Sequence, residues 1–316
     1  MPLNKKQFRV NDFFCGAGGM GLGFKQAGFN IVGAWDFDKY AVQSYRVNVG
    51  DHVKQSDIRE MVWQDVPTAD VWTFGFPCQD LSIANPDGDG LDGKRSGLFF
   101  QVMRLLEETQ HNNPKALPKV VMAENVVGLR PYLPVLEREY GRNGYKALYT
   151  KLNSKYFGVP QSRERYFVIG IRADLDHTLF NFPYQSGVDS GMRIKHILQD
   201  DSEIDSKFYL SDKAIEYMSR ERKGKPRWEY HKNEVDGIAA TLTANMWKGV
   251  PYGVIQGLPR YRRFTPRECA RLQGFPDSYM QVVSDTQFYK QMGNGVTVTV
   301  ANALAKEIKW FLGEVK

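Results

Sequence analysis

Cysteine is scarce in this chain: only Cys15, Cys78 and Cys269 occur among its 316 residues. So sparse and odd a set argues against a disulfide framework and fits a reduced compartment, where each thiol has to be judged for its reactivity. Long apolar runs are lacking too, since none approaches the roughly 18 residues of a membrane span, and no signal peptide is recognisable at the N-terminus. The five histidines are scattered, and no group of residues has metal-ligand spacing. We therefore expect neither a membrane protein nor a metal site.

The composition that is present is that of a folded globular protein, with 42% hydrophobic and 25% charged residues. The length permits one large domain or two. Lysine and arginine outnumber the acidic residues by 42 to 36, and the resulting formal charge of +6 is a first, general indication of a polyanionic partner.

Short apolar runs alternate with helix-like stretches through the first 170 residues. This alternation is typical of an α/β fold with a largely parallel sheet. Helices are expected from a glycine-rich turn to about Ala27, over Asp38–Val47, and at the end of the chain over Val296–Leu312. The expected strands are Phe8–Phe14, Asn30–Trp35, Val71–Phe76, Lys119–Ala123 and Arg165–Ile171.

Four chemically useful residues fall at or just after the ends of these strands, namely Phe14, Asp36, Cys78 and Glu124. Because ligands of α/β sheets bind at the carboxyl ends of the strands, the sequence predicts a functional site on this rim. Beyond about Phe182 the chain becomes polar and irregular. We expect a first domain of residues 1–183, completed by 285–316, and a smaller second domain of residues 184–284.

The first strand leads into a glycine loop. Gly16, Gly18 and Gly21 have G-x-G-x-x-G spacing, and Asp36 follows Gly16 by twenty positions, at the end of the next strand. Glycines let the backbone approach a ligand closely, and the acid accepts hydrogen bonds from ribose hydroxyls. The pattern predicts a nucleotide-like cofactor but does not separate a dinucleotide from S-adenosylmethionine.

Cys78 differs from the other two cysteines in its surroundings. Pro77 fixes the turn before it, polar residues follow, and the segment 80–97 is long and punctuated by glycine, which suits a lid. A thiol in such a place is a candidate nucleophile. Cys15 and Cys269 are expected to be buried packing residues.

Further motifs follow the glycine loop and the Pro77-Cys78-Gln79 step. They are Glu124-Asn125-Val126, then NSKYFGVPQSRERYFVIG with Gln161, Arg163 and Arg165 in Q-x-R-x-R spacing, then RRFTPRECARLQGFPDSY, and last QMGNGVTV with Gly293-Asn294-Gly295. With these motifs, the sequence closely resembles the DNA cytosine C5-methyltransferase family, of the type found in bacterial and phage restriction-modification systems. Two positions depart from its pattern: Asp36 stands where the family most often has glutamate, and Gly295 where it often has serine. Neither removes a group that the chemistry needs.

The resemblance implies a Rossmann-like S-adenosylmethionine-dependent methyltransferase sheet, with residues 184–284 as a smaller, irregular target-recognition domain and hinge. It implies transfer of a methyl group to carbon 5 of a flipped-out cytosine in a specific double-stranded DNA sequence. Addition of the Cys78 thiolate to carbon 6 would turn carbon 5 into an enamine carbon. Glu124 would hydrogen-bond or protonate N3, and Arg165, with Arg163, would orient Glu124 and bind the carbonyl oxygen of the base.

By the same resemblance, S-adenosylmethionine would bind on the rim, without a metal. Phe14 and Phe37 would flank the adenine, Asp36 would hold the ribose, and Asp57 with Ile58 would contact the adenine edge. The remaining expected cofactor positions are Gly16, Ala17, Gly18, Gly19, Pro77, Leu98, Asn294 and Val296.

DNA contacts are expected from two kinds of residue. Basic clusters with interleaved aromatic residues, one around Arg227 and one around Arg260 and Arg262, favour phosphate contact. Thr241-Leu242 resembles a Thr-Leu step that is common in the recognition domains of the family. The complete expected set is Gln79, Ser82, Arg95, Arg227, Thr241, Leu242, Arg260 and Arg262.

Three alternatives compete with this interpretation. A nicotinamide dehydrogenase would leave the Cys78 and Glu124 motifs without a role. A related methyltransferase of transfer RNA should carry a Cys-Phe-Thr signature, which the sequence lacks, and a repressor on an inactive scaffold should have lost Cys78 or Glu124. We expect a monomer that acts on DNA in the cytoplasm, and any cognate restriction endonuclease would share its DNA site without forming a complex with it.

Overall fold

A computed structural model describes residues 7–77, 96–222, 224–230 and 233–315. The chain divides into two compact units, and both are discontinuous in sequence. Unit 1 consists of Met1–Leu152, Glu164–Tyr184 and Val300–Lys316, and unit 2 of Asn153–Arg163 and Gln185–Thr299.

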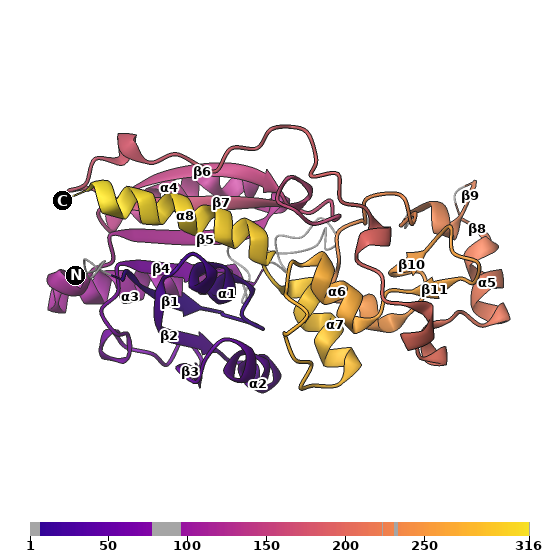
Figure 1. Cartoon of the computed structure of the whole chain (residues 1–316). Coiled ribbons are helices and arrows are strands. Elements are labelled where there is room, and N and C mark those ends of the chain that lie inside the picture. Colours follow the sequence, from indigo (N-terminus) through magenta and orange to yellow (C-terminus); the bar gives the residue numbers. More distant parts are fainter. Residues whose placement is uncertain (1–6, 78–95, 223, 231–232, 316) are drawn as a thin grey trace, which may run out of the picture. The chain divides into compact units, whose positions relative to one another are not determined.

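Unit 1 is built on a seven-stranded sheet with the order β3-β2-β1-β4-β5-β7-β6 (Figure 1). The strands from β1 to β5 pair in parallel, and β7 is antiparallel to β5. Successive strands extend the sheet from β1 to β3 on one side and from β4 on the other, so the strand order reverses between β1 and β4, where ligands of such sheets bind. The strands are β1 (Arg9–Phe13), β2 (Asn30–Asp36), β3 (Val53–Gln55), β4 (Val71–Phe74), β5 (Val120–Val126), β6 (Tyr145–Asn153) and β7 (Glu164–Arg172).

Helices cover both faces of this sheet. In Figure 1, α1 and α8 pass in front of it and α4 lies behind it, and a hydrogen bond from Asn302 of α8 to the Gly23 carbonyl of α1 joins the front pair. On the other face, α3 and α4 bury apolar side chains in one core with β4, β5 and β7. The helices are α1 (Gly19–Gln26), α2 (Lys39–Asn48), α3 (Phe99–Asn112), α4 (Leu133–Arg142) and α8 (Val298–Glu314).

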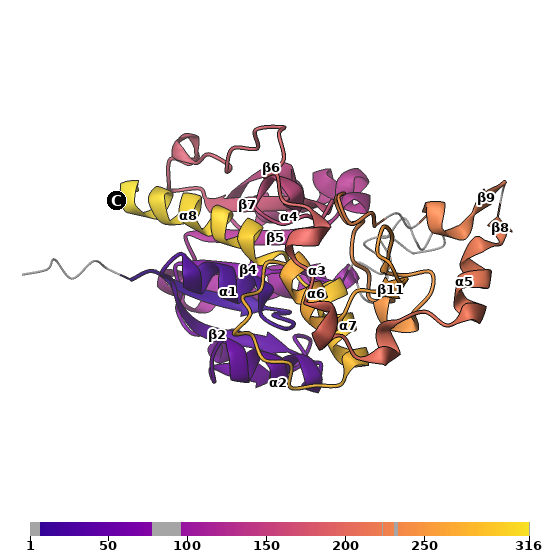
Figure 2. The same ribbon diagram turned by 45° about the vertical axis from the view of Figure 1, so that its right-hand side comes forward.

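Unit 2 consists largely of loops and short 3₁₀ turns (Figure 2). It contains a buried ion pair, in which Arg262 donates to both carboxylate oxygens of Glu268 at 2.8 and 2.9 Å. Glu268 also completes a capping box with Thr265 at the start of α6. The regular elements of unit 2 are α5 (Asp212–Ser219), α6 (Pro266–Leu272), α7 (Asp285–Asn294), β8 (Glu221–Arg222), β9 (Lys225–Pro226), β10 (Val254–Ile255) and β11 (Arg262–Arg263).

The five expected strands and the three expected helices are present. One boundary was wrong in a way that matters for the site: β5 runs on to Val126, so Glu124 lies within the strand and not just after its end. The strand is longer because β7 continues to pair with it, as far as Val126 opposite Arg165. Strands β3 and β6 were not expected, since β3 has three residues and β6, which alternates between buried and exposed positions, is not a continuous apolar run like the strands that were expected.

The expected domains and the two units differ at residues 153–163 and 285–299, which belong to unit 2, and at Tyr184, which belongs to unit 1. The side chains of Gln161 and Arg163 explain the first difference, because they bind main-chain groups at Leu242 in the same unit. The assignment of a target-recognition role to this part of the chain stays a prediction. Among the helices of the described ranges, none combines the length and hydropathy needed to cross a membrane.

Candidate active site

The glycine loop after β1 is held by the residue that ends β2. The amide N–H of Gly16 donates to Oδ2 of Asp36 at 2.8 Å, and the N–H of Asp38 donates to Oδ1 at 2.9 Å. Gly18 has a φ of 91°, and a Cβ there would come within 2.5 Å of the Val49 side chain, so conformation and space both require glycine. Burial raises the pKa of Asp36 above its ordinary value, and the backbone hydrogen bonds oppose that shift.

A second carboxyl group, that of Asp12, lies in β1, the strand that precedes the glycine loop. Asp12 is buried, and its Oδ1 accepts a hydrogen bond from the Thr73 hydroxyl at 2.9 Å. Burial raises its pKa to about 7, the nearby charge of Asp36 adds to the shift, and hydrogen bonds from Thr73 and the Gly21 backbone oppose it. The sequence argument did not single out this residue.

The other expected cofactor positions of unit 1 are placed as follows. Phe37 directly follows Asp36 and is 74% exposed, which leaves a flat apolar surface at the strand end. Phe14 and Leu98 pack partly buried against the sheet core. The carboxylate of Asp57 pairs with Arg59, which lowers its pKa, and the carbonyl of buried Ile58 accepts a hydrogen bond from Arg104 at 3.0 Å. The Gly16–Gly19 loop and Asp36 thus form a backbone cradle of the kind that binds a nucleotide-like group.

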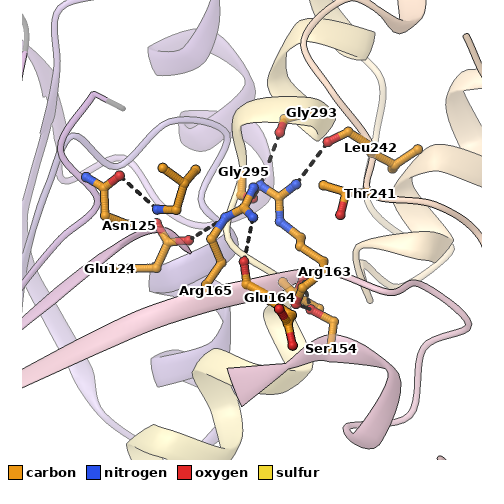
Figure 3. Close-up of polar contacts among 12 residues, drawn as sticks. Glu124, Asn125, Ser154, Arg163, Glu164, Arg165, Thr241, Leu242, Gly293 and Gly295 are labelled. Atoms are coloured by element: carbon orange, nitrogen blue, oxygen red, sulfur yellow. Dashed lines mark hydrogen bonds and ion pairs between the residues drawn. The ribbon is translucent and has the colours of Figure 1, made fainter. Parts of the chain in front are cut away.

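Glu124 and Arg165 form an ion pair between β5 and β7 (Figure 3). Glu124 lies opposite Phe167, and Arg165 stands two residues before Phe167, so the two side chains share one face of the strand pair. Nε of Arg165 lies 3.3 Å from Oε1 of Glu124, and the two side chains are only 15% and 9% exposed. The carbonyl of Glu164 accepts a further bond from Nη1 of Arg165 at 2.7 Å, which fixes the guanidinium beside the acid.

Asn125, the next residue of β5, holds a neighbouring part of the rim. Its Nδ2 donates to the carbonyl of Phe76 at 3.0 Å, and its Oδ1 accepts from the N–H of Val126 at 2.8 Å. Phe76 comes two residues before Cys78 in the sequence. The sequence argument named the Glu124-Asn125-Val126 motif without giving Asn125 a role. An amide next to a candidate acid is the signal that could have found it.

Four expected site residues, Cys78, Gln79, Ser82 and Arg95, lie outside the described residues. The other two cysteines are buried, as expected for packing residues. Burial raises the pKa of both thiols well above the ordinary value, so they stay protonated at neutral pH. Neither Cys15 nor Cys269 is therefore a good nucleophile.

Arg163 has a different position from the one expected. Its side chain is buried in unit 2, where Nη1 donates to the carbonyl of Leu242 at 3.0 Å. Nη2 donates to the carbonyls of Gly293 and Gly295 at 3.1 and 2.9 Å (Figure 3). Both terminal nitrogens are thus committed to main-chain oxygens, and this corrects the expectation that Arg163 shares the role of Arg165 at the base.

Comparison with known proteins shows the family to which the chain belongs. Residues 8–310 match the family described as C-5 cytosine-specific DNA methylase. The chain belongs to this family. It is 34% identical to the Type II methyltransferase M.NlaX of Neisseria lactamica, with 98% of each chain covered. It is 31% identical to the Type II methyltransferase M.HhaI of Haemophilus parahaemolyticus, with 95% of this chain and 94% of that protein covered.

Solved structures agree on the fold. The S. pombe Dnmt2 methyltransferase superposes with a TM-score of 0.74 at 22% identity, with 97% of this chain and 99% of that chain covered. The Entamoeba histolytica methyltransferase EhMeth gives 0.77 at 18% identity, with coverage of 98% and 99%. The family match and the Type II relatives show that the chain is a DNA (cytosine-5-)-methyltransferase, with S-adenosylmethionine as methyl donor and DNA as substrate. The dehydrogenase alternative is excluded.

Two of the expected DNA contacts of the methylase need correction. The Arg262 side chain is 1% exposed and is bound by Glu268, so it is not available to a phosphate. Leu242 is buried, and both of its main-chain polar groups are already bound by Gln161 and Arg163. Arg260, by contrast, is exposed and lies over the Tyr209 ring with 4.2 Å to its centroid.

The remaining expected positions in unit 2 are less constrained. Arg227 lies over the Tyr217 ring at 4.4 Å, and the hydroxyl of Thr241 donates to the Ser162 carbonyl at 2.6 Å. Asn294 is exposed at the end of α7, and Val296 is half-buried. Their roles toward DNA and cofactor stay predictions.

Proposed function

We propose that the methylase acts on one cytosine of a specific double-stranded DNA sequence through a covalent bond between Cys78 and carbon 6 of the base. The observation that supports this most directly is the Glu124–Arg165 pair, a shielded carboxylate fixed by an arginine on the same sheet as the glycine loop. Membership of the family indicates the reaction, and Glu124 of this pair provides the carboxyl group that can hydrogen-bond or protonate the cytosine.

Each residue then has a defined task. The thiolate of Cys78 adds to carbon 6, and Glu124 relieves the charge that develops on the ring by hydrogen-bonding or protonating N3. Arg165 holds Glu124 in place and can donate to the carbonyl oxygen of the base. S-Adenosylmethionine supplies the methyl group to carbon 5 and leaves as S-adenosylhomocysteine. Loss of the carbon 5 proton and release of the thiolate restore the aromatic ring and the free enzyme.

The cofactor would be held by the residues of the glycine loop and the strand ends. Backbone groups of Gly16 to Gly19 fit the close approach of a ligand, Asp36 can accept from ribose hydroxyls, and exposed Phe37 can cover one face of the adenine. Pro77, Leu98, Asn294 and Val296 complete the proposed set.

A base within a duplex cannot reach a thiol, so the target must be flipped out at a cost of a few kcal/mol. We assign unit 2 to target recognition, with Arg227 and Arg260 as phosphate contacts and Thr241 in the readout segment. The Type II relatives support a place in a restriction-modification system, with an endonuclease that acts on the same DNA site. The enzyme would act as a monomer in the cytoplasm, where its DNA lies.

Covalent trapping tests this proposal. Duplex DNA that carries 5-fluorocytosine at the target should bind the enzyme irreversibly, because fluorine at carbon 5 cannot leave as a proton. Peptide mapping should place the bond at Cys78, and Cys78→Ala should abolish both trapping and tritium transfer from labelled S-adenosylmethionine. Transfer to RNA in place of DNA, or a bond at Cys15 or Cys269, would refute the proposal.

A further inference from the structure

Leu242 is held through both of its main-chain polar groups by two buried side chains. Its N–H donates to Oε1 of Gln161 at 2.9 Å, and its carbonyl accepts from Nη1 of Arg163 at 3.0 Å. Backbone bonds align the same two segments, from Ala239 N–H to the Pro160 carbonyl and from Ser162 N–H to the Ala239 carbonyl, both at 2.8 Å. Hydrogen bonds therefore hold residues 239–242 alongside residues 160–163.

The same two side chains also bind two further segments of unit 2, at Leu272 and at residues 293–295. Nη2 of Arg163 reaches the carbonyls of Gly293 and Gly295, and Nε2 of Gln161 donates to the Leu272 carbonyl at 2.9 Å. At Gly293 a Cβ would come within 2.2 Å of the carbonyl carbon of Thr243, so the two backbones touch. We call the contacts of Gln161 and Arg163 with Leu242, Gly293 and Gly295 the main-chain clamp.

The segment that leaves the clamp returns to the surface. Thr243 is exposed, Met246 is buried, and Trp247 is 39% exposed at the tip of a short 3₁₀ turn. The ammonium groups of Lys248 and Lys290 lie 5.7 and 5.6 Å from the centroid of the Trp247 ring. An exposed indole with two ammonium groups beside it is suited to contact DNA, since ammonium groups bind phosphates and an indole can stack on bases.

We propose that Gln161 and Arg163 are positioning residues for target discrimination: the main-chain clamp fixes residues 241–248 so that their exposed side chains meet the DNA in one register. This inference rests on the proposed recognition role of unit 2. Discrimination requires side chains held to well under an ångström, and this region has little regular secondary structure to hold them. Charged hydrogen bonds from a planar, buried guanidinium supply that rigidity.

The test compares methylation of the cognate duplex with that of duplexes changed by one base pair. Arg163→Lys keeps the charge but loses the planar group that spans Leu242 and the two glycines. The ratio of cognate to near-cognate kcat/KM should fall by about tenfold, since one wrong base pair is discriminated by on the order of 10- to 100-fold. The KM for S-adenosylmethionine should not change, and kcat with saturating cognate DNA should fall by less than about threefold.

Two further variants separate positioning from general loss of stability. Thr241→Val removes the bond to the Ser162 carbonyl and should lower the discrimination ratio in the same direction but less. Tyr289→Phe removes a buried bond of 2.6 Å to the Phe264 carbonyl in the same unit and should lower the melting temperature at an unchanged ratio. The inference is overturned if Tyr289→Phe lowers the ratio as much as Arg163→Lys, or if Arg163→Lys keeps the ratio. A wild-type enzyme that fails to methylate DNA would refute the proposed function itself.

Discussion

Glu124 and Arg165 meet because β5 and β7 pair in one particular register, with Glu124 opposite Phe167 and Val126 opposite Arg165. In a strand pair, side chains alternate between the two faces, so a shift of one residue would move one partner to the opposite face. The antiparallel β7 in a sheet that is otherwise parallel along β1 to β5 is thus the element that gives the acid its arginine.

Glu124→Gln should lower kcat by about 10²- to 10⁴-fold, because the amide can donate a hydrogen bond to N3 but cannot transfer a proton. Affinity for DNA and cofactor should change little, and the methylated sequence should stay the same. Single-turnover methyl transfer with saturating substrates measures this. Glu164→Gln is the matched control, since Glu164 is a half-exposed neighbour paired with Lys151 at 3.1 Å, and it should behave like wild type. Equal losses in both variants would remove the case for Glu124.

Arg260→Ala should weaken binding to all DNA sequences about equally and reduce the log–log salt slope by roughly 1, because it would remove one proposed phosphate contact. Arg262→Ala should leave the slope unchanged and instead lower the melting temperature, because it strands buried Glu268 without its partner. Salt titrations of binding and thermal unfolding separate the two. A changed sequence preference in Arg260→Ala would mark that residue as a base reader.

Asp12→Asn should stabilise the free enzyme above pH 7 and have no effect at low pH. The folded pKa of Asp12, about 7, lies above its ordinary value of 3.8, so the fold favours the protonated acid. The stability that this group contributes is complete below pH 3.8 and is lost as the pH rises to about 7. Three pKa units correspond to at most about 4 kcal/mol. Urea unfolding at pH 5 and pH 8 measures the difference, which should be larger at pH 8. A difference independent of pH would contradict the assignment.

Replacement of residues 184–284 by the equivalent region of a relative with another target should change the sequence that is methylated. Trapping by 5-fluorocytosine at Cys78 should persist, since Glu124 and Arg165 are both in unit 1. Sequencing of DNA methylated by the hybrid gives the answer. Retention of the original target would show that recognition lies elsewhere in the chain.

The sheet could be predicted from the sequence because buried parallel strands are continuous apolar runs, as in Val120–Ala123. The position of the site could be predicted from the sheet, since Asp36 and Glu124 both lie near the carboxyl ends of its strands. The glycine loop was also predictable, because the φ of 91° at Gly18 needs the one residue that adopts it without strain.

The roles of the arginines could not be predicted in the same way. Arg163 and Arg165 stand two residues apart, yet one binds main-chain carbonyls and the other binds Glu124. Arg262 lies in a basic run that indicates DNA binding, but it is buried against Glu268. The sequence shows that such a residue is charged, but the group to which it binds depends on contacts between segments far apart in the chain. Irregular segments such as 241–248 have no periodicity from which those contacts could be inferred.

The main-chain clamp has a consequence for how this enzyme can evolve. Toward Leu242, Gly293 and Gly295 it contacts only amide and carbonyl groups, which every substitution at neighbouring exposed positions preserves. Substitutions at Trp247 or Lys248 therefore change what the surface presents and leave these main-chain contacts in place, whereas the Thr243 hydroxyl also accepts a hydrogen bond from the Asn245 N–H at 3.3 Å. If these positions read the DNA, as proposed, new targets can be reached by substitutions there one at a time while the main-chain contacts of Gln161 and Arg163 stay in place.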